Sequence, residues 1–307
     1  QKKYREALLQ HADAARQSRE LARLRTDAPC AFEIERFRYR GPDRAACFAI
    51  FSELGFRTLL AEYAPTAETV ERDYRLVDSR EALAELAGEL RRAGAFALRV
   101  ITSPGPAVQA DLVGLAVATA PRGARYIPVG HHALDSGPQI VPGEALAALR
   151  PLLEDETVGK VGHDLKADAV ALARHGVTLR GLRFDTMLAS YLLDATRSSH
   201  PLEVSSLEHL GYRAVTEESV CGRGARALAL GDLPPAAVLA YAGERADLPL
   251  QLADRFGALL QSEGLEPVYR ELELPLIPVL AALERAGVKL DGAVLAGLSG
   301  RVERELN

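Results

Sequence analysis

The chain has 307 residues, of which 48% are hydrophobic and 26% charged, and its formal net charge is −5. This composition is typical of a soluble globular protein with one large domain or two medium ones, and any nucleic-acid contact has to be local because the chain has no overall basic character. The three cysteines form no CxxC pair, which argues against a zinc site or a disulfide framework and favours a reducing compartment. No apolar run approaches the roughly 18 residues of a membrane span, so we expect a cytoplasmic protein without membrane contact.

The first part of the chain is predicted to be mostly helical. Residues 1–27 combine helical periodicity with many charges, which indicates a solvated amphipathic helix. Residues 28–40 alternate apolar and polar side chains, as an extended segment does. A second helix is expected to begin after Pro42 and to end near Gly55. Residues 61–75 show no strong period and are predicted to be a linker.

Strands and helices alternate from residue 76 to residue 262. Strands are predicted over residues 95–101, 111–118, 124–129, 158–163 and 178–183, and helices over residues 79–93, 142–153, 165–175, 185–193, 202–210 and 235–262. Three consecutive strands followed by strand–helix alternation indicate an α/β fold, with a mixed sheet flanked by helices.

A further helical segment begins near Leu265. Two prolines interrupt its apolar stripe, and Gly287 marks its end. The segment has the pattern of the first helix of another domain. Because the chain starts at Gln1 and its last residues stop inside a helical pattern, we expect it to be a piece of a longer protein.

Four stretches resemble, in order, parts of the family A DNA polymerases, the bacterial DNA polymerase I family. They are "KKYREALLQHADAARQSRELARLRTDAP", "KVGHDLKADAVALARHGVTLRGLRFDTMLASYLL", "LAYAGERADLPLQL" and "ELELPLIPVLAALERAGVKLD". The resemblance implies that residues 1–62 are the C-terminal end of a 5′-nuclease domain and residues 63–75 a linker. It further implies an RNase H-like 3′–5′ exonuclease fold over residues 76–262, and the start of a polymerase domain over residues 263–307.

The resemblance also implies where a metal site would lie. Family members hydrolyse the 3′ phosphodiester with two divalent metals, held by an Asp-x-Glu on the first strand, an Asp ending an "NLKYD"-like stretch and a Tyr-x-x-x-Asp on the last helix. In this sequence Arg99 and Ile101 stand at the Asp-x-Glu positions, and Arg245 replaces the last Asp. Of this set only Asp168 and Tyr241 remain.

These replacements predict a site that does not hydrolyse the 3′ phosphodiester. Two like unit charges 4 Å apart repel by about 4 kcal/mol at an effective dielectric of 20, and a divalent ion facing an arginine feels roughly twice that. Asp164 and Asp168 are left as weak metal candidates, and we expect no metal in this chain. We expect Asp168 to pair instead with Arg99 or Arg245. The simpler role for Asp185 is a helix N-cap.

Other polar groups carry weaker predictions. His131, His132 and His163 could act as ligands or acid–base groups, although their positions favour a structural role. Arg223 and Arg226, in the stretch "GRGAR", are candidates for a DNA-phosphate contact, and a solvated loop is the simpler interpretation.

The preferred interpretation is a segment of a DNA-directed DNA polymerase of replication and repair, whose proofreading domain is inactive and serves as a scaffold. The expected partner is DNA, bound through a monomeric parent polymerase that uses Mg²⁺, and this segment itself needs no cofactor. Two alternatives remain open at this point. One is a metal-dependent 3′–5′ exonuclease with a rearranged site, and the other is a non-catalytic single-stranded DNA clamp that uses Arg99 and Arg245.

Overall fold

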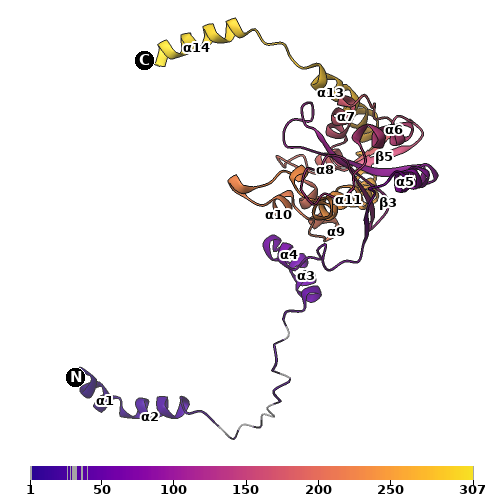
Figure 1. Cartoon of the computed structure of the whole chain (residues 1–307). Coiled ribbons are helices and arrows are strands. Elements are labelled where there is room, and N and C mark those ends of the chain that lie inside the picture. The colour runs from indigo at the N-terminus through magenta and orange to yellow at the C-terminus, as the bar shows by residue number, and fades with distance from the viewer. Residues whose placement is uncertain are drawn as a thin grey trace. The chain divides into compact units, whose positions relative to one another are not determined.

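The chain forms two compact units, residues 1–43 and residues 44–307, in a computed structural model that describes residues 2–25, 27, 29, 33–35, 37–39 and 41–306 (Figure 1). The first unit contains the exposed helices α1 (Lys2–Gln10) and α2 (Ala12–Leu21). The helix predicted over residues 1–27 is therefore divided at His11, whose backbone is not helical. The extended segment predicted over residues 28–40 lies largely outside the described residues.

Six strands form one mixed sheet in the second unit. They are β1 (Asp73–Leu76), β2 (Ala95–Thr102), β3 (Leu112–Ala120), β4 (Gly123–Pro128), β5 (Gly159–Gly162) and β6 (Leu182–Asp185). Their order is β1-β4-β3-β2-β5-β6, in which β3 pairs antiparallel with β2 and β4 and the other pairs are parallel. The predicted mixed sheet is confirmed. A short turn joins the antiparallel strands β3 and β4, and a longer loop, residues 103–111, joins β2 to β3. The parallel strands β5 and β6 need a helix between them.

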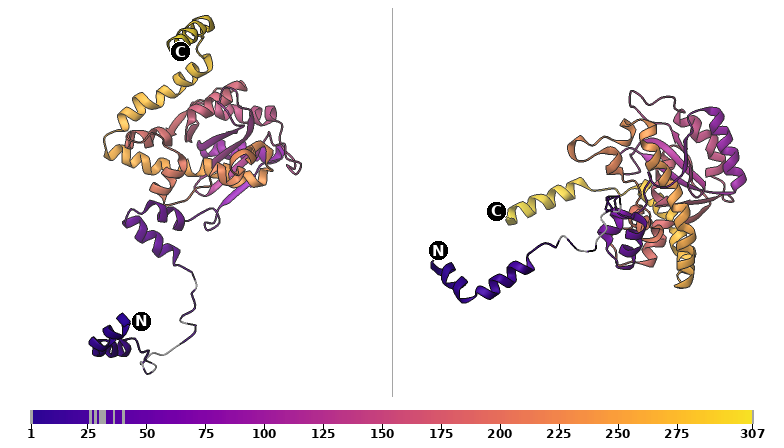
Figure 2. Two further views of the ribbon diagram at one scale, coloured as in Figure 1. Left: turned by 90° about the vertical axis from the view of Figure 1, so that its left-hand side faces the viewer. Right: turned by 90° about the horizontal axis from the view of Figure 1, so that it is seen from below.

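Helices cover both faces of this sheet (Figure 2). The main ones are α5 (Arg80–Ala93), α6 (Pro142–Leu153), α7 (Leu165–Arg174), α8 (Thr186–Leu193), α9 (Leu202–Leu210) and α11 (Pro235–Ser262). Helices α5, α6 and α7 share one hydrophobic core with one face of the sheet, and α11 packs on the opposite face. The predicted bounds of these helices agree with the observed ones to within a residue or two.

The two-residue period of β2 decides where the site lies. Phe96, Leu98 and Val100 enter the core beneath α5, α6 and α7. Ala97 and Ile101 enter the core beneath α11. Because side chains alternate along a strand, Arg99 projects to the α11 side, at the end of β2 that meets the N-terminus of α7. Ile101, at the second acid position of the family, is a buried core residue.

Several elements differ from the prediction. Strand β1 falls where a linker was expected, and β6 begins four residues later than the predicted strand at 178–183. The remaining elements are α3 (Arg44–Glu53), α4 (Arg57–Tyr63), α10 (Glu217–Cys221), η1 (Gly224–Arg226), η2 (Leu230–Asp232), α12 (Glu266–Val268), the π-helix η3 (Tyr269–Glu273), α13 (Leu274–Ala286) and α14 (Gly292–Leu306). Within the described ranges, no helix is both long enough and apolar enough to cross a bilayer.

Helix α11 lies unusually close to β1, and Gly243 makes this approach possible. A methyl group at Gly243 would lie 2.5 Å from Cδ2 of Tyr74. The ring cannot easily move aside, because the Tyr74 hydroxyl donates a hydrogen bond to Asp247 Oδ2 at 2.6 Å. Overpacking of this kind costs about 1–3 kcal/mol, against a helix-propensity gain of about 1 kcal/mol for Gly→Ala.

We therefore expect Gly243→Ala to lower the free energy of unfolding by up to about 2 kcal/mol in urea denaturation. Gly257→Ala on the same helix is the matched control. Its new methyl group would meet Phe184 Cε2 only at 4.0 Å, so this change is expected to be neutral or stabilising. Equal effects of the two changes would contradict the close approach of α11 to β1.

Candidate functional site

The positions that correspond to the family's metal acids come together where β2 meets the first turn of α7. Asp168 lies in that turn and is 1% exposed. Its Oδ1 accepts a hydrogen bond from the backbone N–H of Val100 at 3.0 Å and lies 3.6 Å from Nη1 of Arg99. The same Nη1 donates a hydrogen bond to the carbonyl oxygen of His163 at 2.9 Å. Of the two arginines predicted as partners of Asp168, Arg99 is thus the one that approaches it.

Burial controls the charge of Asp168. Its second oxygen, Oδ2, is buried and has no hydrogen-bond partner within the described part of the chain. Burial raises the pKa of Asp168 to about 7, and the nearby charge of Arg99 lowers that pKa by less than burial raises it. Asp168 therefore carries its proton for much of the time at neutral pH.

Arg245 has a different partner. It is 8% exposed on α11, and its Nη2 lies 2.5 Å from Glu203 Oε1 and donates a hydrogen bond to the Val215 carbonyl at 3.0 Å. Its guanidinium carbon lies 4.4 Å from the ring centre of Tyr241, as in a cation–π contact. The Tyr241 hydroxyl in turn donates to Glu217 Oε2 at 3.3 Å.

Sequence analysis did not find Glu203 or Glu217. Each lies on a short helix, α9 or α10, well separated in sequence from its partner on α11. No residue spacing links such positions, so the sequence alone held no signal for these contacts.

Asp185 is an N-cap, as predicted, and also supports α7. It is 1% exposed, and its Oδ1 accepts hydrogen bonds from the N–H groups of Met187 and Leu188 at the start of α8. Its Oδ2 accepts from the N–H of Leu165 at 2.7 Å, and its Oδ1 from that of Asp164 at 3.2 Å. One buried carboxylate therefore caps α8 and holds the turn that begins α7.

Asp164 itself caps α7. Its backbone is left-handed with φ 65°, and its side chain accepts a hydrogen bond from the N–H of Ala167 at 3.4 Å. It therefore precedes the helix and does not share a helical face with Asp168.

A cleft of about 370 Å³ lies over these groups. Its lining includes Arg99, Asp164, Glu203, Glu217, Tyr241 and Arg245. In the part of the chain that the structure describes, no three His, Cys, Asp or Glu side chains converge as metal ligands. The one family acid that remains, Asp168, is buried behind a guanidinium. These residues do not fit a pair of divalent ions.

The histidines have structural partners. His163 Nδ1 lies 2.9 Å from Thr186 Oγ1, and burial, with help from Arg99 and Arg245, lowers the pKa of His163 to about 3. His131 is buried between the Tyr126 hydroxyl and the Leu233 carbonyl, and burial lowers its pKa as well. Both imidazoles are therefore neutral at physiological pH.

The two loop arginines lie apart from the cleft lining. Arg223 Nε lies 2.5 Å from Glu218 Oε1, so its charge is partly compensated by a neighbouring residue. Arg226 is exposed in η1. A DNA contact by either residue stays a prediction.

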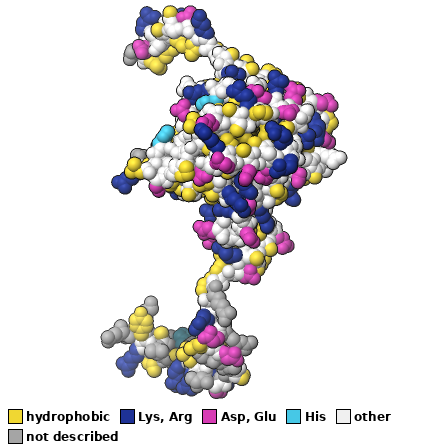
Figure 3. Space-filling view, turned by 45° about the vertical axis from the view of Figure 1, so that its right-hand side comes forward, with side chains coloured by type: hydrophobic (Ala, Val, Ile, Leu, Met, Phe, Trp, Pro, Cys, Tyr) yellow, Lys and Arg dark blue, Asp and Glu magenta, His cyan; other side chains and the backbone are white. Residues whose placement is uncertain are grey.

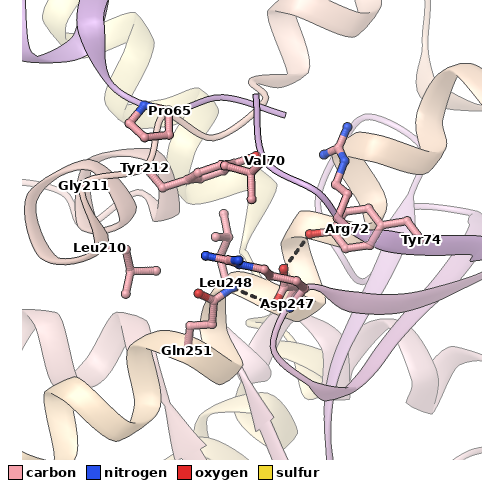
Figure 4. A pocket seen from close by; sticks show the side chains of 11 residues that line it. Pro65, Val70, Arg72, Tyr74, Leu210, Gly211, Tyr212, Asp247, Leu248 and Gln251 are labelled. Carbon is pink, nitrogen blue, oxygen red and sulfur yellow. Dashed lines mark hydrogen bonds between the residues drawn. The ribbon is translucent and has the colours of Figure 1, made fainter. Parts of the chain in front are cut away.

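Two further buried carboxylates, Glu244 and Asp247, attach α11 to neighbouring elements by hydrogen bonds. Asp247 accepts hydrogen bonds from the Tyr74 hydroxyl, the N–H of Arg122 and the amide of Gln251, beside a small cavity of about 130 Å³ (Figure 4). It lies away from the cleft lining, as its position two residues after Arg245 predicts.

The carboxylate oxygens of Glu244 also accept several hydrogen bonds. It accepts hydrogen bonds from Arg72 Nη1 at 3.0 Å, the Tyr212 hydroxyl at 2.6 Å and the N–H of Val215 at 2.6 Å. These carboxylates attach α11 to β1, to the β3–β4 turn and to the segment after α9, so neither is available for chemistry.

Known proteins share this sequence and fold. Residues 74–261 match the family model described as 3′-5′ exonuclease. DNA polymerase I of Pseudomonas aeruginosa is 33% identical over 94% of this chain and 33% of its own length. DNA polymerase I of Chloroflexus aurantiacus is 33% identical over 97% of this chain and 35% of its own length. The chain thus spans about a third of the length of the curated relatives that it matches.

Solved structures agree. The POL domain of Pol1 from M. smegmatis, in complex with DNA primer-template and dNTP, is 27% identical, with a TM-score of 0.57 over 74% of this chain and 34% of that one. Brucella melitensis NrnC with bound Mg²⁺ has a TM-score of 0.51 at 17% identity over 71% of this chain and 95% of that one, which shows the fold alone. The RNase H-like α/β fold is confirmed. The chain therefore belongs to the 3′–5′ exonuclease domain family of DNA polymerase I.

Proposed function

We propose that residues 76–262 form an exonuclease domain that has lost its chemistry and serves as a structural domain of a DNA polymerase I. The observation that carries this proposal is the Arg99 guanidinium 3.6 Å from Asp168, at the position of the family's first metal acid. Residues 1–62 are then the end of a 5′-nuclease domain, residues 63–75 a linker and residues 263–307 the start of the polymerase domain. The whole monomeric protein acts on DNA in the cytoplasm and uses Mg²⁺ in its polymerase site.

Electrostatics supports the loss of activity. A divalent ion bound to Asp168 would lie beside the fixed positive charge of Arg99. The carboxyl group of Asp168 is itself partly protonated at neutral pH, which weakens it as a metal ligand. Repulsion from one unit charge at 4 Å is about 4 kcal/mol at an effective dielectric of 20, and a divalent ion doubles it. Arg245 adds a second guanidinium to the same cleft.

A structural role is supported by the packing of the last helices onto the sheet domain. Ile277 of α13 belongs to the core that α5, α6 and α7 share with the sheet. Lys166 Nζ of α7 lies 2.6 Å from Glu284 Oε2 of α13. The hydroxyl of Tyr269, in η3, accepts a hydrogen bond from the N–H of Asp185 at 2.6 Å. The exonuclease-like domain and the proposed start of the polymerase domain therefore share a hydrophobic core.

The test is the degradation of a 3′-labelled single strand by this chain with Mg²⁺ or Mn²⁺. We expect no cleavage by the natural chain, and metal-dependent cleavage by the triple variant Arg99→Asp, Ile101→Glu, Arg245→Asp, because it restores the acids of a two-metal site. Arg301→Asp with Arg304→Asp, on the exposed helix α14, alters the charge by a comparable amount away from the site and should stay inactive.

Ile101 is a core residue, so each variant's fold is checked by circular dichroism and thermal unfolding. The double variant Arg99→Asp, Arg245→Asp, which keeps Ile101, is the second route should the triple variant misfold. Metal-dependent cleavage by the natural chain would contradict the proposal and make Asp164, Asp168 and Asp185 the ligands to test.

A further inference from the structure

The cleft over the former metal site carries more negative than positive charge. Its lining holds two arginines, Arg99 and Arg245, and three acids, Asp164, Glu203 and Glu217. Asp168 lies directly behind Arg99. His163, which also lines the cleft, adds no positive charge because its pKa is lowered to about 3. The family's positions for metal acids have become basic, while acids from neighbouring helices now face them.

Each cleft arginine already has an acidic neighbour. Glu203 lies 2.5 Å from Arg245, and Asp168 lies 3.6 Å from Arg99, which also donates to the His163 carbonyl. Asp164 and Glu217 form no ion pair within the described part of the chain, although they bind Ala167 N and the Tyr241 hydroxyl. Asp168 is left out of this balance because it is protonated for much of the time at neutral pH, and the lining still holds three acids against two arginines.

We infer that this cleft is closed electrostatically to a nucleic-acid strand, because its acids mask the two arginines. The inference rests on the proposed loss of nuclease chemistry and adds a role for the residues that replaced it. A strand carries one negative charge per phosphate and binds where cationic side chains neutralise those charges. Here Glu203 pairs with Arg245, while Asp164 and Glu217 oppose the charge of Arg99 and repel phosphate. A strand's 3′ end is then not withdrawn into a site that cannot process it.

The face of the molecule drawn in Figure 3 carries no continuous basic path over its described residues. Basic and acidic side chains are interspersed over the face drawn in Figure 3. This mixture agrees with the net charge of −5. Removal of the cleft acids should therefore change binding locally.

The experiment measures fluorescence anisotropy of a labelled oligothymidylate of about 12 nucleotides with the full 307-residue chain in EDTA, at about 50 mM and about 300 mM salt. The test variant is Asp164→Asn, Glu203→Gln, Glu217→Gln. Asparagine suits the left-handed cap at position 164, and each change removes a charge while keeping the shape of the side chain. We expect affinity at low salt to rise about tenfold or more over the natural chain, and this gain to shrink at high salt.

Asp254→Asn is the matched control. Asp254 is exposed on α11 and does not line the cleft, so removal of its charge should change affinity less than about twofold. Addition of Arg99→Gln and Arg245→Gln to the triple variant should abolish the gain, because the unmasked arginines are the groups that would contact phosphate.

Two results would overturn the inference. In one, the triple variant binds no better than Asp254→Asn. In the other, the natural chain already binds the strand and loses affinity on Arg99→Gln with Arg245→Gln, as a DNA clamp would. Should the triple variant misfold, Asp164→Asn with Glu217→Gln leaves the Arg245–Glu203 pair intact and still predicts a gain of about threefold or more. Because EDTA removes the metals, this binding test is independent of the proposed function. Failure of the proposed function would appear only as cleavage in the presence of Mg²⁺ or Mn²⁺.

Discussion

Replacement of Asp185 by alanine is expected to lower the free energy of unfolding by about 4 kcal/mol, although Asp185 has no catalytic role in the proposed function. The carboxylate satisfies the N–H groups of Asp164 and Leu165 before α7 and those of Met187 and Leu188 in α8. A buried donor left without a partner costs about 1–3 kcal/mol, and loss of an N-cap about 1 kcal/mol. One substitution thus removes support from two helices.

Urea denaturation measures this effect. Asp185→Asn keeps one acceptor oxygen and should lose about half as much stability as alanine. Asp254→Ala, at an exposed position of α11, is the control and should stay within about 0.5 kcal/mol of the natural protein. A loss below about 1 kcal/mol for Asp185→Ala would mean that other groups satisfy these helix starts.

Asp168→Asn is expected to stabilise the protein increasingly as the pH rises from about 4 to about 7. The folded-state pKa of Asp168 is raised to about 7 by burial, from an ordinary value of 3.8. A carboxyl group with a raised folded-state pKa stabilises the fold below its unfolded pKa, and that contribution is lost as the pH passes through the folded value. Asparagine resembles the protonated form and has no such loss.

The quantity to measure is the difference in unfolding free energy between Asp168→Asn and the natural protein, from pH 4 to pH 8.5. One pKa unit corresponds to about 1.4 kcal/mol, so the difference should grow by up to about 4 kcal/mol and then level off above pH 7. The contributions of the other titrating groups to the unfolding free energy cancel in this difference, because both proteins contain those groups. If the natural protein instead became the more stable of the two as the pH rises, Arg99 and an ionised Asp168 would form a stabilising ion pair.

Much of the fold could be predicted because its core helices have clear periodicity and caps. Helix α5 begins at the N-cap Ser79 and ends at Gly94 in a left-handed conformation, both of which are visible in the sequence. Strand β1 could not be predicted, because its four residues alternate between exposed and half-buried positions and include two charged side chains. Its place at the sheet edge depends on α11, which lies far along the chain.

The candidate site was predictable only in part. The replacements at 99, 101 and 245 followed from aligned motifs, and the approach of Arg99 to Asp168 was one of two alternatives. The Glu203 partner of Arg245 was missed because tertiary packing alone joins α9 to α11. One signal was available for the network behind α11. Glu244, Arg245 and Asp247 follow one another closely in the otherwise apolar first part of α11, residues 235–250, and buried charges in such a stretch require partners.

The hydrogen bond from Val100 N to Asp168 Oδ1 bears on how a remaining acid in such a domain is interpreted. An acceptor oxygen at position 168 ties β2 to the first turn of α7 whether or not a metal is ever bound there. The side chain at this position therefore serves the fold as well as the metal chemistry of its family. An acid that is present at such a position does not by itself indicate that a domain of this kind removes mismatched nucleotides.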